Sequence, residues 1–237
     1  MEIDPETEIS SLEKMVRLDF QNVLSFQVNQ IRLEGELFIP SHSEFLAVLI
    51  LEEKEDKFSE RFSKMRTLLN EKGIATLLLK GLLTQDEREI HANRSDTALL
   101  SYRLSEITKR IKLIEGAEFL KISYIGLSSV AARMFRAAAN SNSEVESLIL
   151  IGNGLQEYDG NFPETSILNI LGELDFTGKI INRSILSKIG TLIKRVYFVP
   201  GSPNHFEDNS KWSLVSEAIQ RWYSFPQKRT EEFSEFL

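Results

Sequence analysis

The stretch "YIGLSSVAARMF", residues 124–135, runs from an apolar, strand-like segment through Gly-x-Ser into a helical pattern. Gly126 and Ser128 fit the first part of Gly-x-Ser-x-Gly, which places a nucleophilic serine on a sharp turn between a strand and a helix. Val130 stands where that pattern has its second glycine. Serine is also a common helix cap, so Ser128 is either a nucleophile or the cap of an ordinary helix. The rest of the chain has to distinguish these two interpretations.

The composition is that of a soluble protein with one large domain. The chain has 237 residues, 42% of them hydrophobic, which is enough for a sizeable core. It contains no cysteine, which excludes disulfides and thiolate metal sites, and its formal charge of -7 argues against nucleic-acid binding. No apolar run reaches the roughly 18 residues of a membrane span, and the acidic start "MEIDPETEIS" lacks the basic region of a signal peptide. We therefore expect a cytoplasmic protein with no nucleic-acid or membrane partner.

Apolar runs of strand length alternate with helical patterns along the chain. The predicted strands cover residues 22–28, 31–40, 45–51, 74–79, 119–125, 147–151, 166–171 and 195–199. Helical stripes of apolar residues fall within 58–69, 100–114, 131–138 and 212–222. The first two strands predict an antiparallel hairpin. Because parallel neighbours need a crossover helix, the later alternation predicts a mostly parallel, doubly wound α/β sheet.

Three polar residues each follow one of these predicted strands, in the order Ser128, Asp175 and His205. The carboxyl ends of parallel strands meet at one edge of the sheet, where ligands bind in such folds. A serine hydroxyl becomes nucleophilic when a neutral imidazole accepts its proton, and a carboxylate orients that imidazole. The order predicts Ser128 as nucleophile, His205 as base and Asp175 as the orienting carboxylate. The alternative is structural: Asp175 caps the next turn, and His205 is an ordinary loop residue.

From about residue 30 to residue 223 the sequence resembles the dienelactone-hydrolase-like branch of the α/β-hydrolases. The resemblance is carried, in chain order, by "IRLEGELFIP", "LLNEKGIATLLL", "NRSDTALLSYRL", "YIGLSS", "ILGELD" and "VPG" followed by "HFED". It implies an α/β-hydrolase fold and a serine or cysteine hydrolase of small esters or lactones, with no metal and no cofactor. It further implies that the oxyanion is bound by backbone N–H groups of Ser129 and of Glu52 or Glu53.

The sequence departs from this family pattern at three places. A β-branched Val130 in place of glycine predicts a shifted or strained turn. Glu52-Glu53 replaces the His-Gly segment of the family, and it brings negative charge to the predicted oxyanion site. The loop "PGSPNHF" aligns Asn204 with the family histidine if no residue is inserted, and His205 if the loop is one residue longer. The alternative function is therefore an α/β-hydrolase fold without catalysis that serves as a binding or scaffold protein.

The resemblance also predicts how the chain is divided. Residues 1–21 form an N-terminal extension, 22–223 the α/β-hydrolase domain and 224–237 a C-terminal tail. The segment after the sixth strand, 152–165, is short for a lid, which implies an open pocket suited to small esters. Arg94 and Asp96 match a family Arg-x-Asp, or they form a salt bridge at the start of a helix. The sequence does not specify an oligomeric state.

Overall fold

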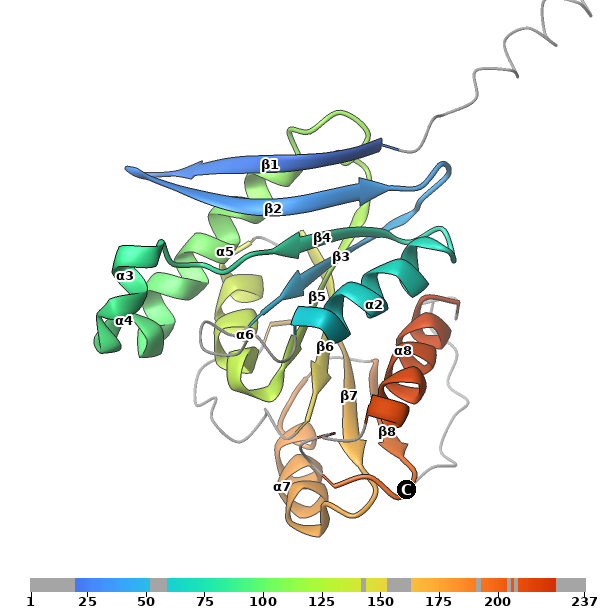
Figure 1. Ribbon diagram of the computed structural model, residues 1–237. Helices are drawn as coiled ribbons and strands as arrows, with labels where there is room; N and C mark the ends of the chain where they lie inside the picture. Colours follow the sequence, from blue (N-terminus) through green and yellow to red (C-terminus); the bar gives the residue numbers. More distant parts are fainter. Residues whose placement is uncertain are drawn as a thin grey trace, which may run out of the picture.

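An eight-stranded, mostly parallel sheet forms the centre of the molecule, seen in a computed structural model (Figure 1). The structure describes residues 20–51, 59–141, 144–152, 163–190, 193–203, 206 and 209–224. The strands are ordered β1-β2-β4-β3-β5-β6-β7-β8. β1 pairs antiparallel with β2, and β2 antiparallel with β4, whereas every later pairing is parallel. The predicted fold class, an α/β-hydrolase sheet with an N-terminal antiparallel hairpin, is confirmed.

The strand bounds follow the apolar runs of the sequence closely. The strands are β1 Phe20–Val28, β2 Ile31–Ile39, β3 Phe45–Ile50, β4 Ala75–Leu79, β5 Lys121–Leu127, β6 Val145–Ile151, β7 Ser166–Gly172 and β8 Lys194–Val199. β3 lies in the middle of the sheet, and its alternate residues pack into two different cores. Leu46 and Val48 belong to one core, and Ala47 and Leu49 to the other. A strand buried on both faces is apolar throughout, which is why its sequence shows no alternation.

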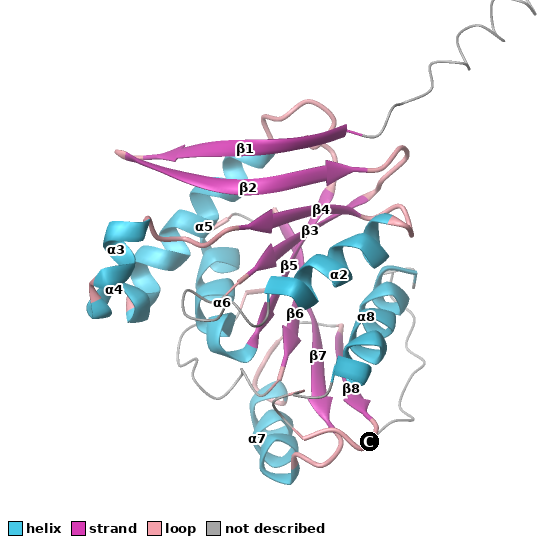
Figure 2. Cartoon of the chain, viewed as in Figure 1, coloured by secondary structure: helices cyan, strands magenta, loops and turns pink. Residues whose placement is uncertain are grey.

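Helices cover both faces of the sheet and give three layers (Figure 2). The helices are α2 Ser59–Asn70, α3 Gln85–Glu89, α4 His91–Ser95, α5 Thr97–Ile111, α6 Ala131–Asn140, α7 Phe176–Leu186 and α8 Asn209–Ser224, with a 3₁₀ turn, η2, at Ser128–Val130. Buried residues of α5 and α6 share one core with the sheet, and those of α2 and α8 share the other. The half-buried Ile185 and Leu186 of α7 pack against the α5–α6 core.

Several elements differ from the sequence-based expectation. β5 is displaced by two residues toward the C-terminus, because Phe119 is 91% exposed whereas Gly126 and Leu127 belong to the strand. α5 ends at Ile111, earlier than expected, and Ile114 lies in the turns that follow it. The short helices α3 and α4, and all of α7, were not predicted. In the part of the chain that is described, no helix is both long and apolar enough to cross a membrane.

Candidate functional site

The nucleophile candidate lies where β5 gives way to α6. Leu127 is the last residue of β5, and Ser128 directly follows it as the first residue of η2. The expected position of Ser128, at the carboxyl end of a central parallel strand, is therefore confirmed for its backbone, whereas its side chain is not among the described parts. Since α6 begins only at Ala131, a 3₁₀ turn separates strand from helix.

Val130 explains why a glycine is needed on the other side of this turn. Val130 is fully buried, and its Cγ2 occupies the space beside the α-carbon of Gly126. A Cβ on Gly126 would overlap that methyl group and would come within 2.8 Å of Met134 Sδ. The branched residue fills the space between strand and helix, so the departure from Gly-x-Ser-x-Gly is accommodated by the missing side chain of Gly126.

Asp175 sits at the start of α7, three residues beyond the end of β7. Its Oδ1 accepts a hydrogen bond from the backbone N–H of Gly178 at 2.8 Å, so Asp175 is the N-cap of α7. The structural alternative raised for this residue is thus correct for one of its oxygens. The second oxygen, Oδ2, is buried and has no hydrogen-bond partner among the described residues. Oδ1 therefore serves as the helix cap, and Oδ2 remains available to accept a hydrogen bond.

The loop after β8 is bonded to the loop that carries Asp175. The backbone N–H of Leu174 donates to the carbonyl of Ser202 at 3.0 Å, and the N–H of Gly201 donates to Glu173 Oε2 at 2.8 Å. A Cβ at Gly172 would overlap the carbonyl oxygens of both Ser202 and Pro203. Glycine is required at the end of β7 because the backbone of the second loop crosses it at contact distance.

Phe206 fixes the same loop on its far side. Its ring is buried against Trp212, with 6.5 Å between the ring centroids, and its φ of 46° is uncommon for a residue with a side chain. Its carbonyl oxygen accepts hydrogen bonds from Trp212 Nε1 at 3.2 Å and from Arg61 Nη1 at 3.0 Å. His205 itself lies outside the described residues, but the chain on both sides of it is held in place.

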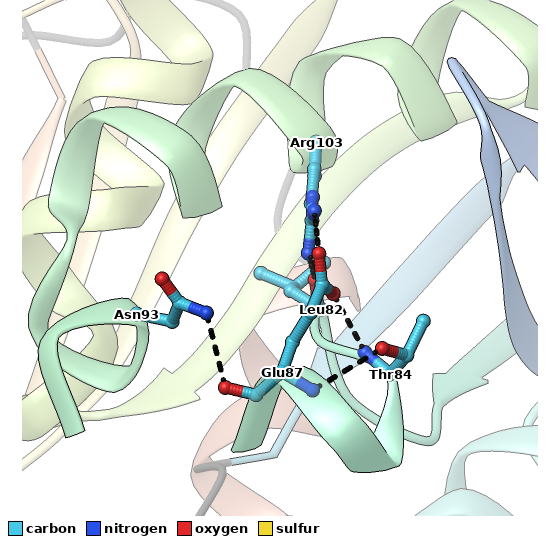
Figure 3. Close-up of polar contacts among 5 residues, drawn as sticks. All are labelled: Leu82, Thr84, Glu87, Asn93 and Arg103. Atoms are coloured by element: carbon cyan, nitrogen blue, oxygen red, sulfur yellow. Dashed lines mark hydrogen bonds and ion pairs between the residues drawn. The ribbon is translucent and has the colours of Figure 1, made fainter. Parts of the chain in front are cut away.

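The segment after β4, at the same edge of the sheet, is held by a partly buried ion pair (Figure 3). Arg103 on α5 donates from Nη2 to Glu87 Oε1 at 2.7 Å, and from Nη1 to Glu87 Oε2 and to the carbonyl of Leu82, each at 2.8 Å. Glu87 also forms a capping box with Thr84 at the start of α3. The Arg103 guanidinium lowers the pKa of Glu87 to about 2. This carboxylate is therefore a structural charge.

The pair Arg94 and Asp96 follows that segment, and the structure gives each residue a different role. Asp96 is the N-cap of α5, accepting from the backbone N–H of Leu99 at 2.9 Å. The carbonyl of Arg94 accepts a hydrogen bond from Arg133 on α6 at 2.8 Å. The described contacts include no ion pair between Arg94 and Asp96, so the local role of this motif is helix capping.

Apolar side chains lie exposed beside Asp175. Phe176 is 70% exposed, and Leu174 and Phe198 are also accessible to solvent. Lys179 Nζ lies 5.4 Å from the ring centre of Phe176 and 4.9 Å from that of Phe198, which joins α7 to the end of β8. The exposed residues near Asp175 thus include apolar side chains and the cation of Lys179.

The oxyanion candidates are only partly described. Ser129 lies in η2, and its side-chain Oγ is buried with no hydrogen-bond partner among the described residues. Glu52 and Glu53 lie outside the described residues, directly after Leu51, the residue that follows β3. Within the described ranges, no group of three or more His, Cys, Asp or Glu side chains is arranged to hold a metal ion.

A surface hollow lies away from this edge, between the start of β3, the turn before β4 and the end of α8. Its lining carries both signs of charge, from Lys72, Glu217 and Arg221 among others. None of the predicted site residues lines it, and we place the candidate site at the carboxyl ends of the strands, where Asp175 and the backbone of Ser128 lie.

Sequence reasoning did not identify three residues that shape this site: Gly172, Gly178 and Phe206. Each lies next to a predicted site residue in the sequence, but that position alone does not indicate its role. The two glycines flank the aspartate in "GELDFTG", and the phenylalanine directly follows the histidine in "NHF". Their roles depend on which backbone or carboxylate lies against them, and that information comes from tertiary structure.

Comparison with solved structures identifies the fold class. The chain is similar to a dienelactone hydrolase from Anabaena variabilis, with a TM-score of 0.74, 25% sequence identity, and coverage of 87% of this chain and 97% of that chain. It is also similar to an α/β serine hydrolase without a lid from Xanthomonas campestris, with a TM-score of 0.65, 15% identity, and coverage of 88% and 97%. The chain therefore has a dienelactone-hydrolase-like α/β-hydrolase fold.

Sequence comparison also finds curated relatives. Proteins named "Putative phosphoribosyl transferase" from two strains of Mycobacterium tuberculosis are 25% identical to this chain over 196 residues, covering 81% of it. The chain spans only 44% of the length of those relatives. No protein-family model matches the chain.

Proposed function

We propose that the chain is a serine hydrolase of small esters or lactones that uses Ser128, His205 and Asp175. In this mechanism Ser128 Oγ attacks the substrate carbonyl while His205 accepts its proton, and His205 then returns the proton to the leaving oxygen. Water then attacks the resulting ester on Ser128. His205 accepts the proton of this water and gives it to Ser128 Oγ as the acid product leaves. Asp175 orients the imidazole and stabilises its cation. The backbone N–H of Ser129, and one from Glu52 or Glu53, bind the oxyanion.

The observation that carries this proposal is the state of the Asp175 carboxylate. A simple helix cap needs one oxygen, and Asp175 uses Oδ1 for it. Oδ2 is buried, and a buried carboxylate oxygen without a hydrogen bond costs folding free energy. We therefore expect a hydrogen-bond donor next to Oδ2. The imidazole N–H of His205 is the donor that the sequence offers, and His205 follows Pro203 by two residues in the loop bonded to the Asp175 loop.

Dienelactone hydrolases and esterases among the structural neighbours support a hydrolase function. A small substrate agrees with the short segment available as a lid and with the exposed apolar side chains of Phe176 and Phe198. The activity in the name of the mycobacterial relatives is not carried over, because more than half of their length lies outside the match.

A fluorophosphonate probe tests the proposal without knowledge of the substrate, because it reacts with a serine only when that serine is activated. We expect the wild-type chain to be labelled at Ser128, as located by peptide mass spectrometry, and Ser128→Ala to lose the label while remaining folded. Asp175→Asn should be labelled at least tenfold more slowly. Labelling of wild type no faster than that of Ser128→Ala would overturn the proposal and favour the alternative of a non-catalytic binding protein.

A further inference from the structure

We infer that Gly178, held by the buried pair Asn182 and Asn169, positions the Asp175 carboxylate so that only Oδ2 is offered to the base. The catalytic consequence of this inference rests on the proposed function, whereas its structural part stands on the contacts alone. Gly178 touches no reacting atom in this scheme. It is a positioning residue that acts through Asp175.

Gly178 lies in the first turn of α7, where a glycine is otherwise unfavourable. Glycine is less favourable than alanine inside a helix, and no positive φ requires it at this position. Space is what requires it. A Cβ at residue 178 would overlap Asp175 Oδ2 and would lie 2.5 Å from Cγ and 2.9 Å from Oδ1. The carboxylate therefore occupies the volume in which any other side chain would begin.

The hydrogen bond from Gly178 N–H fixes which oxygen is used. Oδ1 accepts this bond at 2.8 Å, at the N-terminal end of α7, where the helix dipole is positive. Oδ2 is then the oxygen left without a described partner. An imidazole N–H that approaches Asp175 meets a carboxylate whose rotation is already restricted, which lowers the entropic cost of aligning the base.

A buried amide pair anchors this turn to the sheet. Asn182 on α7 donates from Nδ2 to the carbonyl of Gly178 at 2.8 Å, and Asn169 on β7 donates from Nδ2 to Asn182 Oδ1. Both amides are buried, with exposed fractions of 1% and 0%. β7 leads directly into the Asp175 loop, so these bonds join the strand before Asp175 to the helix turn after it. The position of the carboxylate is thereby set from both sides.

The test is Gly178→Ala, with Gly190→Ala as the matched control. No heavy atom lies within 4 Å of the place where a Cβ at Gly190 would be, so that control should change neither activity nor stability. Gly178→Ala should lower kcat/KM on a small activated ester at least tenfold. It should also lower the apparent pKa of the base on the acid limb of the pH profile, because the imidazolium loses its aligned carboxylate. A purely structural role would lower Tm and leave that pKa unchanged.

A double-mutant cycle with Asp175→Ala separates the clash between the new Cβ at residue 178 and the Asp175 carboxylate from any other effect of Gly178→Ala. The described atoms nearest to the new Cβ all belong to Asp175, so removing that side chain removes the clash. We expect Gly178→Ala to lower Tm by about 4 °C or more in the wild-type background and by much less in the Asp175→Ala background. In the latter background it should add no further loss of kcat/KM. Equal losses in both backgrounds would overturn the inference.

Failure of the inference differs from failure of the proposed function. If wild type neither reacts with a fluorophosphonate nor hydrolyses esters, the proposed function and the catalytic consequence of Gly178 both fall, while the Tm cycle still reports the packing of Gly178 on Asp175. If wild type is active and Gly178→Ala keeps its kcat/KM and pH profile, the hydrolase stands and the positioning role is wrong.

Discussion

The side chain of Val130 and the α-carbon of Gly126 are in direct contact across the turn that carries Ser128. The family pattern places small residues on both sides of this turn. Here the larger residue is on the helix side, and the glycine on the strand side accommodates it. The two positions should therefore behave as a coupled pair.

Gly126→Ala tests this coupling. A new methyl group in a filled core typically destabilises by about 1–3 kcal/mol, and we expect that loss in urea unfolding of Gly126→Ala. Val130→Ala alone should also destabilise, since it leaves a cavity. In the Val130→Ala background, the added methyl of Gly126→Ala should cost clearly less, because the overlapping Cγ2 is gone. Additive losses in the double variant would show that the two residues do not compete for the same space.

Gly172→Ala should impair activity through the loop that precedes His205. The atoms that a new Cβ would meet are the backbone carbonyls of Ser202 and Pro203, which move only if the loop moves. A displacement of about 1 Å at a reacting group can cost roughly a hundredfold, so we expect kcat/KM to fall at least tenfold. Measuring the fluorophosphonate labelling rate on the same protein reports the base directly. Gly190→Ala again serves as control, and an unchanged labelling rate in Gly172→Ala would contradict the expectation.

The positions of the strands could be predicted from the sequence because buried parallel strands are marked by continuous apolar runs. The same feature explains the error in β5. The apolar run "FLKISYI" includes Phe119, which the fold leaves exposed, whereas Gly126 lies in the strand without an apolar side chain to mark it. An apolar run predicts that a strand forms. The residues at which the strand begins and ends depend on its pairing with the neighbouring strands.

The sequence does not predict α7, because the fully buried residues of this helix are not apolar. Its buried residues are Gly178 and Asn182, whereas Phe176 and Ile180 are exposed. The first turns of α7 pack through this glycine and this amide, and its apolar contacts with the α5–α6 core come from the half-buried Ile185 and Leu186 at its C-terminal end. Asp175 could still be placed after β7 from chain order alone. Gly178 determines that Oδ1 of Asp175 caps the helix and that Oδ2 faces the site. The local sequence pattern does not show this role of Gly178.

Glu87 should make the protein sensitive to acid. The hydrogen bonds from Arg103 lower its pKa to about 2, from 4.5 in an unperturbed glutamate. A carboxylate whose folded-state pKa is lowered stabilises the fold above its unfolded pKa, and this stabilisation is lost as pH falls from about 4.5 toward 2. At pH 7, Glu87→Gln should lower the free energy of unfolding by about 2 kcal/mol, less than the full shift implies because the side chain is 24% exposed.

The matched control for Glu87 is Glu89→Gln, an exposed glutamate on the same helix. Unfolding free energies measured between pH 2 and pH 7 should converge for wild type and Glu87→Gln at the acid end. Glu89→Gln should follow wild type over the whole range. A difference between wild type and Glu87→Gln that stays constant with pH would mean that the ion pair with Arg103 is not the source of the acid sensitivity.

Replacing Glu52-Glu53 by His-Gly should raise turnover. In the sequence these residues follow Leu51, the residue after β3, and the resemblance to the dienelactone-hydrolase-like branch implies an oxyanion donor at this position. A fixed carboxylate about 5 Å from the developing oxyanion would oppose it by roughly 3 kcal/mol at an effective dielectric near 20, comparable to losing one oxyanion donor. The neutral ester in the ground state is affected much less, so the effect falls on kcat rather than on KM.

The expected result is a gain in kcat on a small activated ester of up to about a hundredfold, with little change in KM, because solvent screens part of the full electrostatic effect. The double replacement combined with Ser128→Ala should be inactive, which excludes a contaminating esterase. Glu60→Gln, which removes a charge from the exposed pair with Lys64 on α2, controls for the change in net charge and should leave kcat unaltered. If the double replacement leaves kcat unchanged or lowers it, the two glutamates do not act on the oxyanion. The negative charge of Glu52 and Glu53 would then be no argument against catalysis by Ser128.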